Sequence, residues 1–486
     1  MQNPPRSLES CAYIYSYTKL ESFFMLNKVL THLDENIEKS LERLFSLLRF
    51  QSISTDSTYK DECCKAADWL VEDLKSIGFE ASRRDTSGHP IVVGHHPGPS
   101  DDCLHVLFYG HYDVQPVDPL SLWEDDPFTP SLKEREGDEV ICARGASDDK
   151  GQLMTFIEAC RAFKKEIGQL PVKVTVLCEG EEEIGSPSLV PFLKANKDEL
   201  KADCALVCDT SMWDVDTPSI SVALRGLLGE EVIITAANRD LHSGYFGGAA
   251  ANPIRILTKV LAGLHDENNR VTLPGFYDGV EETPLHILQS WNALNCTAEN
   301  FLGPIGLSLP AGEKGRSILE LVWARPTAEI NGISGGYEGE GIKTVIASQA
   351  SAKVSFRLVH KQDPEKIRQA FRDYVRSLIP ADCTVVFKGH GASPAIQLPY
   401  DSPFVGAAKD ALSQEWRNPA LLTVMGGSIP IVADFQSILD METVLVGFAL
   451  ADDRIHSPNE KYNLKSFHKG QRSWARILAT LAKTGG

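Results

Sequence analysis

The sequence has no long apolar run and no excess of positive charge, and each absence argues against a class of function. None of its apolar stretches approaches the length of about 18 residues that a membrane-spanning helix needs. The net charge is −18, from 48 Lys and Arg against 66 Asp and Glu, so the basic footprint of nucleic-acid binders is missing. We therefore expect neither a membrane nor a nucleic-acid partner.

The sequence also lacks a disulfide framework and a secretory signal. Its 11 cysteines include no zinc-type Cys-x-x-Cys pair, and an odd, scattered set in a long chain is typical of reduced thiols. Glu9 and Glu21 fall in a start that has no basic segment followed by an apolar core. We expect a cytoplasmic protein in which residues 1–24 form a disordered leader before a periodic helix that opens at Met25.

The length and the pattern of elements predict two domains. At 486 residues the chain exceeds the size at which one core usually keeps growing. Strands and helices alternate with short links through residues 25–218 and again through 393–486. This alternation predicts an α/β/α catalytic domain around a mainly parallel sheet that is covered on both faces.

Residues 219–392 follow a different order, β-α-β-β-α-β. This order favours an inserted ferredoxin-like α+β domain. We expect its second and third strands near 343–347 and 352–359. The residues that precede these two strands, 266–342, form a Gly- and Pro-rich insert that is longer than an ordinary loop.

Several apolar strands end in residue types that bind metal ions. His111 and Asp113 follow the apolar run 106–109, and this spacing suits a metal ligand with the acid that fixes its tautomer. Ligands of parallel sheets bind beyond the carboxyl ends of the strands, so we expect these side chains to converge. The other segments of this kind are Asp148-Asp149-Lys150-Gly151, Glu179-Gly180-Glu181-Glu182-Glu183, Cys208-Asp209 and His456-Ser457-Pro458-Asn459-Glu460.

Each segment alone has an ordinary structural explanation. Asp148 and Asp149 could cap the helix that follows, the acidic run could be a solvated helix start, and Asp209 could belong to a turn. Together and in this order, the five segments favour one shared site for two divalent ions. Mixed imidazole and carboxylate ligation suits zinc, with manganese or cobalt as alternatives.

These motifs resemble the ArgE/DapE/aminoacylase/carnosinase family of co-catalytic zinc peptidases. The resemblance covers nearly everything after residue 30 and is closest to the dipeptidase branch. In the pattern Arg144-Gly145-Ala146-Ser147-Asp148-Asp149-Lys150-Gly151, Asp149 stands where desuccinylases and acetylornithine deacetylases typically have Met. The resemblance implies two divalent ions, a small peptide substrate and a homodimer built through the inserted lid domain.

The resemblance also gives each motif residue a role. His111 and Asp209 would complete one metal site, Glu183 and His456 would complete the other, and Asp148 would bridge both. Asp113 would orient His111, and a non-proline cis peptide would follow Asp148. The remaining assignments are Glu182 as general base for a hydroxide between the ions, His242 as a stabiliser of the tetrahedral intermediate across the dimer interface, Arg357 as the clamp on the substrate carboxylate, and Ser428 and Asn331 as polar substrate contacts.

The expected function is therefore hydrolysis of dipeptides or short peptides with a free C-terminal carboxylate. N-acyl-amino-acid deacylation, of the acetylornithine deacetylase or succinyl-diaminopimelate desuccinylase type, would use the same ions, and Asp149 favours the dipeptidase over it. An inactive dimeric scaffold is the alternative from another class, and the complete ligand set argues against it. Cleavage of phosphate esters at a two-ion site has no support in this sequence, because the sequence contains no phosphate-cradling loop.

Overall fold

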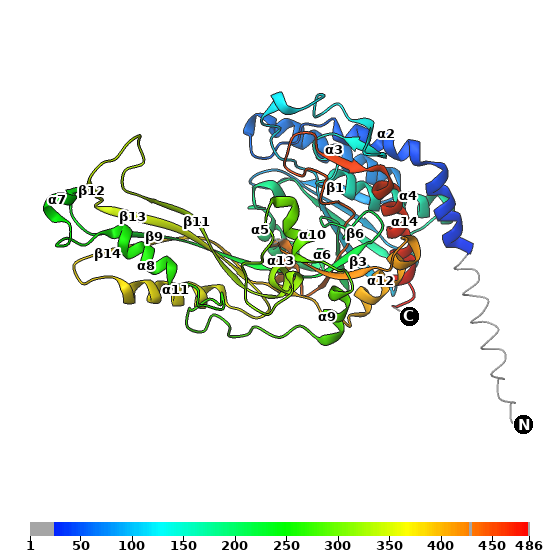
Figure 1. Ribbon diagram of the computed structural model, residues 1–486. Coiled ribbons are helices and arrows are strands. Elements are labelled where there is room, and N and C mark those ends of the chain that lie inside the picture. The colour runs from blue at the N-terminus through cyan, green and yellow to red at the C-terminus, as the bar shows by residue number, and fades with distance from the viewer. Residues whose placement is uncertain (1–23, 427–429, 485–486) are drawn as a thin grey trace, which may run out of the picture. The chain divides into compact units, whose positions relative to one another are not determined.

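A computed structural model describes residues 24–426 and 430–484 of the chain (Figure 1). The leader expected at 1–24 therefore lies outside the described residues, apart from Phe24 in the first helical turn. The described residues form two compact units, of which unit 1 comprises 24–222, Leu398–Leu422 and 434–484, and unit 2 comprises Ala223–Gln397, 423–426 and 430–433. The predicted boundaries, 25–218 with 393–486 and 219–392, stay a prediction, because compactness alone does not show independent folding.

Unit 1 is built on a mixed sheet whose centre is parallel. The strands run in the order β1-β2-β6-β3-β7-β17-β8, and β3 is parallel to both β6 and β7, as β17 is to β7. The antiparallel pairs lie toward the two edges. The strands are β1 (Glu80–Arg84), β2 (Ile91–His96), β3 (His105–His111), β6 (Lys173–Glu179), β7 (Cys204–Val207), β8 (Ser219–Leu224) and β17 (Glu442–Leu445), and a smaller sheet holds β4 (Ser131–Arg135), β5 (Asp138–Cys142) and β18 (Lys461–Asn463).

Helices cover both faces of this sheet, which confirms the predicted α/β class. Successive residues of a strand point to opposite faces. Phe108 of β3 accordingly stacks on Phe156 with ring centroids 3.7 Å apart, and Trp474 meets both rings edge-on. On the other face Tyr109 packs against Phe435 at 5.7 Å. The α-helices of unit 1 are a first helix over residues 24–35, α2 (Ile37–Leu48), α3 (Lys60–Ser76), α4 (Lys150–Ile167), α5 (Leu189–Ala195), α6 (Lys197–Leu200), α12 (Pro403–Glu415) and α14 (Leu464–Leu481).

Unit 2 contains the ferredoxin-like sheet that the sequence predicted. Its four strands are antiparallel and run in the order β11-β13-β9-β14, with the apolar faces of α8 and α11 packed on one side. Its strands are β9 (Gly226–Thr235), β10 (Leu241–His242), β11 (Thr327–Gly335), β12 (Val345–Ile346), β13 (Gln349–Leu358), β14 (Thr384–Ser393) and β15 (Ile396–Gln397), and β16 (Leu421–Met425), like β8, spans the unit boundary. Its helices are α7 (Ser243–Phe246), α8 (Pro253–Ala262), α9 (Leu285–Asn292), α10 (Ala298–Leu302), α11 (Pro364–Leu378) and α13 (Pro430–Asp434).

The predicted second strand of this sheet, near 343–347, is wrong. That segment contains only β12, which pairs with β10 in a separate two-stranded sheet. The second strand is β11, which lies inside the segment 266–342 that the sequence marked as an insert. In β11 only Ala328 is buried, so the strand has no clear alternation of apolar and polar residues to reveal it.

Helix ends follow ordinary capping chemistry. Asp363 accepts hydrogen bonds from the N–H groups of the first turn of α11, and Pro364 occupies the first helical position. Gly168 ends α4 in the left-handed conformation with φ 88°.

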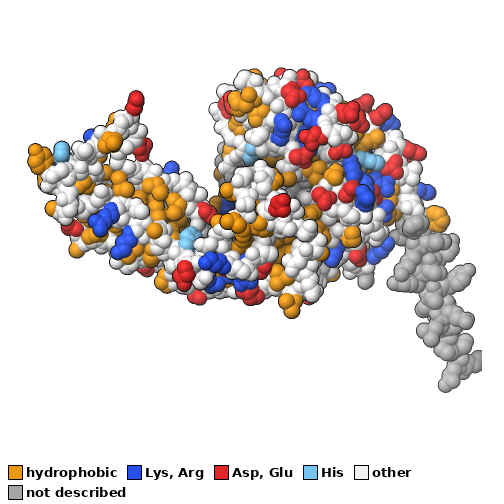
Figure 2. Space-filling model, viewed as in Figure 1, with side chains coloured by type: hydrophobic (Ala, Val, Ile, Leu, Met, Phe, Trp, Pro, Cys, Tyr) orange, Lys and Arg blue, Asp and Glu red, His pale blue; other side chains and the backbone are white. Residues whose placement is uncertain are grey.

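None of the helices in the described residues combines the length and apolar character of a membrane span. On the face shown in Figure 2, acidic and basic side chains are interspersed over unit 1.

The stacked core of unit 1 supports a stability prediction. Phe156→Ala removes a fully buried ring that contacts Phe108 and Trp474. We expect a loss of about 3–5 kcal/mol in the free energy of unfolding, measured by chemical denaturation followed by circular dichroism. Leu132→Ala, at a side chain that is 41% exposed, is the control and should cost less than about 1 kcal/mol. Equal effects of the two substitutions would contradict the packing described here.

Candidate metal centre

Three neighbouring strands place their carboxyl ends side by side. In the order β6-β3-β7, His111 ends β3 directly opposite Glu179 of β6, and Asp209 follows the end of β7 by two residues. This is the edge of the sheet at which the sequence predicted the ligands to converge. Two further segments from distant parts of the chain, around Asp148 and His456, reach the same edge.

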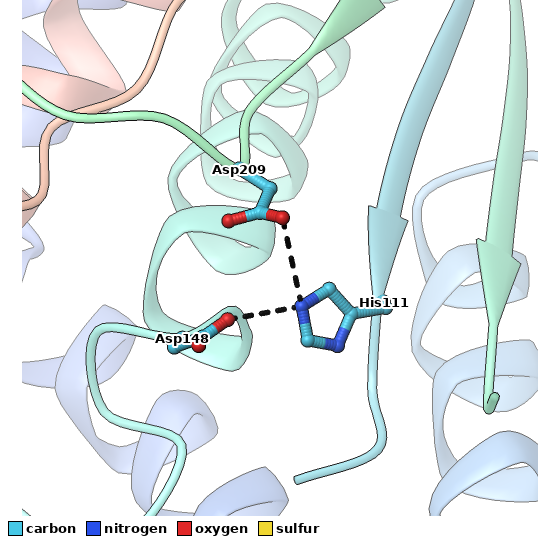
Figure 3. A group of neighbouring side chains, drawn as sticks. All are labelled: His111, Asp148 and Asp209. Atoms are coloured by element: carbon cyan, nitrogen blue, oxygen red, sulfur yellow. Dashed lines mark hydrogen bonds and ion pairs between the residues drawn. The ribbon is translucent and has the colours of Figure 1, made fainter. Parts of the chain in front are cut away.

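The first candidate ligand group is His111, Asp148 and Asp209, shown in Figure 3. The imidazole Nε2 of His111 lies 3.0 Å from Asp148 Oδ1 and 4.0 Å from Asp209 Oδ2. Both carboxylates point toward this nitrogen from different elements. His111 is fully buried, so this geometry sits inside the protein and not in a mobile surface loop.

The second candidate ligand group is Asp148, Glu183 and His456. His456 Nε2 lies 2.9 Å from Asp148 Oδ2 and 3.2 Å from Glu183 Oε2. Gln115 donates to the same Glu183 oxygen at 2.7 Å and so restrains it. Asp148 therefore presents one oxygen to each imidazole and is shared by the two candidate ligand groups.

Asp113 organises both groups although it belongs to neither. Its backbone oxygen lies 3.1 Å from His111 Nδ1, and its carboxylate Oδ1 lies 3.3 Å from the same nitrogen. A proton on Nδ1 leaves Nε2 free to bind a metal ion. The Asp113 carboxylate also accepts from the backbone N–H groups of Glu182, at 3.2 Å, and Glu183, at 3.1 Å. One buried acid thus positions the first imidazole and the turn that carries the acids.

Asp149 holds a structural position and does not cap α4. It makes no side-chain capping hydrogen bond, which removes the simplest structural explanation of the Asp-Asp pair. Its Oδ2 accepts from the backbone N–H of His111, at 3.1 Å, and from the Cys208 thiol, at 3.2 Å. The peptide bond between Asp148 and Asp149 is cis, as the resemblance implied. Asp149 therefore ties the start of α4 to the ends of β3 and β7.

The electrostatics of the two groups are those of a site built for positive charge. Burial and the neighbouring Asp148 raise the pKa of Asp209 to about 7. Burial also raises the pKa of Glu182 to about 8, with added repulsion from Asp209 and Asp148 that the His111 imidazole only partly offsets. Hydrogen bonds to Asp148 and Glu183 raise the pKa of His456 to about 10. Cations placed among these acids would favour their ionised forms, so the donor set fits two divalent ions.

The other predicted residues belong to unit 2. His242 ends β10, is exposed, and accepts the backbone N–H of Gly244 at its Nδ1 at 3.0 Å. Arg357 lies on β13 opposite Thr327 and Leu227. Asn331 is the extra residue of a bulge in β11, between Ile330 and Gly332. Ser428 lies outside the described residues. The substrate roles of these four residues stay predictions.

Sequence reasoning gave no role to two buried charged residues near the site. The Glu460 carboxylate accepts hydrogen bonds from the segment that carries Asp148. Lys150 is fully buried and donates to the backbone oxygens of Leu47, at 3.3 Å, and Phe50, at 2.8 Å. Both residues stand inside motifs that the sequence singled out. Their place in these motifs is the sequence signal that could have pointed to them, whereas their burial is visible only in the structure.

Comparison with known proteins decides the family. A profile described as peptidase family M20/M25/M40 matches residues 107–480. The chain belongs to this peptidase family. It is 28% identical to the Cys-Gly metallodipeptidase dug1 of Schizosaccharomyces pombe over 94% of this chain and 98% of the relative. It is 26% identical to the human Beta-Ala-His dipeptidase, over 94% of this chain and 93% of that one.

A solved structure supports the same placement. The M20 family metallo-carboxypeptidase Sso-CP2 of Sulfolobus solfataricus matches with a TM-score of 0.77 and 29% identity, over 91% of this chain and 99% of that chain. As a member of this family, the chain described here is a hydrolase of the metallopeptidase type. The predicted resemblance and its dipeptidase branch are confirmed.

The two ligand groups predict different losses of metal. Asp148→Ala removes the residue that both groups share, so we expect neither ion to be retained after gel filtration. His456→Ala removes a ligand of one group only and should leave about one ion per chain. Elemental analysis of freshly purified protein measures both. Two retained ions in the Asp148→Ala variant would show that Asp148 does not bridge.

Proposed function

We propose that this M20 peptidase hydrolyses dipeptides and short peptides with a free C-terminal carboxylate, using two divalent ions, with zinc as the expected metal. The observation that carries the proposal is the pair of ligand groups that share Asp148 at the carboxyl edge of the sheet. Relatives whose names specify Cys-Gly and β-Ala-His dipeptides support the substrate class. Manganese and cobalt are the alternative ions for the same donors.

Bound divalent ions would supply a polarised scissile carbonyl and a water of lowered pKa. The chain itself supplies the proton acceptor. No hydrogen bond to the Glu182 carboxyl group is present among the described residues, while its backbone is held by Asp113. The charges of His111, Asp209 and Asp148 all act on its pKa, and the next residue in the chain, Glu183, belongs to the second ligand group. Glu182 would take a proton from the attacking water and deliver it to the leaving amine.

Unit 2 would supply the groups that bind the substrate. Because Nδ1 of His242 accepts a backbone N–H, the neutral ring carries its proton on Nε2, which can then donate to a developing oxyanion. We propose that this imidazole serves the site of a second subunit in a homodimer. Arg357 would bind the terminal carboxylate through its planar guanidinium. Asn331 and Ser428 would add polar contacts.

Metal removal and loss of the base test the chemistry. Chelation should abolish hydrolysis of a dipeptide panel, and added zinc should restore it. Glu182→Gln should lower kcat by about 10²–10⁴-fold while the metal content stays at the parent level, because the residue moves a proton and binds no ion. Glu199→Gln is the control, since Glu199 pairs with Arg84 away from the ligand groups. A Glu182→Gln enzyme with parent kcat would refute the assignment.

The same preparations separate the dipeptidase from the deacylase. With identical enzyme and metal, we expect kcat/KM for dipeptides to exceed that for N-acetyl- and N-succinyl-amino acids. Higher kcat/KM for the N-acyl-amino acids would favour the deacylase hypothesis. Inertness toward every substrate in protein that holds two ions would favour a scaffold.

Subunit mixing tests the position of His242. If His242 acts across a dimer, Glu182→Gln and His242→Ala homodimers, each nearly inactive, should regain activity when their subunits exchange. Random exchange gives half heterodimers with one intact site each, so about a quarter of the parent activity is expected. Mixing without subunit exchange is the control. No recovery despite proven exchange would place His242 in its own subunit's site or outside catalysis.

A further inference from the structure

Glu460 is a buried carboxylate that binds the backbone of the segment carrying Asp148. Its Oε1 accepts from the N–H of Ser147, at 2.9 Å, and of Asp148, at 3.1 Å. Its Oε2 accepts from the N–H of Gly145, at 2.9 Å, and from the Arg144 guanidinium, at 2.8 Å. Both side chains of the ion pair are 1% exposed, so water cannot replace these bonds.

The segment 456–460 therefore contacts Asp148 at both of its ends. At one end, the imidazole of His456 faces the Asp148 carboxylate. At the other end, Glu460 holds the backbone N–H of the same Asp148. Beyond Glu460 the chain enters β18, which pairs with β5 and so fixes this end of the segment to the sheet that precedes the Asp148 loop.

The backbone of this segment is held in an uncommon conformation. Arg454, His456 and Asn459 all have φ between 57° and 62°, in the left-handed region that non-glycine residues seldom adopt. Such conformations persist only where surrounding contacts hold them. Asp453 supplies one anchor by accepting from Ser147 Oγ at 2.7 Å and from Lys461 at 2.8 Å. Glu460 supplies the other anchor, closer to the ligands.

We propose that Glu460 is a positioning residue that sets Asp148 and His456 relative to each other, and thereby the affinity of the His456 ligand group for its metal ion. The inference rests on the proposed two-ion site. A carboxylate is the group required, because all of its partners are donors and the Arg144 charge offsets the cost of burying it. The His111 group depends on Glu460 less, since His111 and Asp209 are held by β3 and β7.

The experiment compares Glu460→Gln with Glu158→Gln. Glu158 is also a buried acid, 2% exposed, and binds Ser40, Arg43 and Arg161, all outside the ligand groups. Both variants lose a buried charge, so both should lose stability. Apoprotein is titrated with zinc against a chromophoric chelator, and thermal unfolding confirms that each variant is folded. Glu460→Asp, which keeps the charge beside Arg144 but shortens its reach, serves if the amide variant does not fold.

We expect the parent and Glu158→Gln to bind two zinc ions with the same affinities. In Glu460→Gln one ion should bind about 10–100-fold more weakly, and the other should bind nearly as in the parent. kcat for dipeptides should fall at limiting zinc with KM little changed, and excess zinc should restore it. Folded Glu460 variants with parent zinc affinities would overturn the inference. A parent that binds no zinc would instead refute the proposed function.

Discussion

The double role of Asp148 is the constraint on which the rest of the structure depends. Its two carboxylate oxygens face two imidazoles that stand 37 and 308 positions away in the chain. One buried imidazole, one exposed imidazole and several acids lie within a few ångströms of one another, and this geometry holds only when each backbone segment is fixed to a fraction of that distance. The parallel centre of the sheet provides the first part of this precision, because it ends β6, β3 and β7 at one edge.

Acids that face the backbone, and not the metal position, provide the second part. Asp113 holds the N–H groups of Glu182 and Glu183, Asp149 holds that of His111, and Glu460 holds that of Asp148. Burying a carboxylate is costly unless hydrogen bonds satisfy it, and each of these acids is satisfied by the segment that it positions. The acids of the motifs thus divide into candidate metal ligands and acids that align the segments carrying them.

The sequence predicted the ligand groups well, but it did not predict every strand or the residues that position the ligands. Ligand-type residues after apolar strands predicted the edge of the sheet and both ligand groups, because strand direction alone brings such residues together. β11 escaped prediction because almost none of it is buried, so its existence depends on pairing with β13. The tasks of Asp149 and Glu460 could not be read from spacing, since each depends on which N–H groups lie opposite the carboxylate in the folded chain. The bulge at Asn331 is likewise a property of register, which only the paired strands define.

A zinc-edge anomalous difference map from crystals of the holoenzyme tests the central claim most directly. We expect two peaks about 3.5–4 Å apart, one beside His111 and Asp209, the other beside His456 and Glu183, with the Asp148 carboxylate between them. A single peak, or peaks whose nearest ligands do not include Asp148, would contradict it.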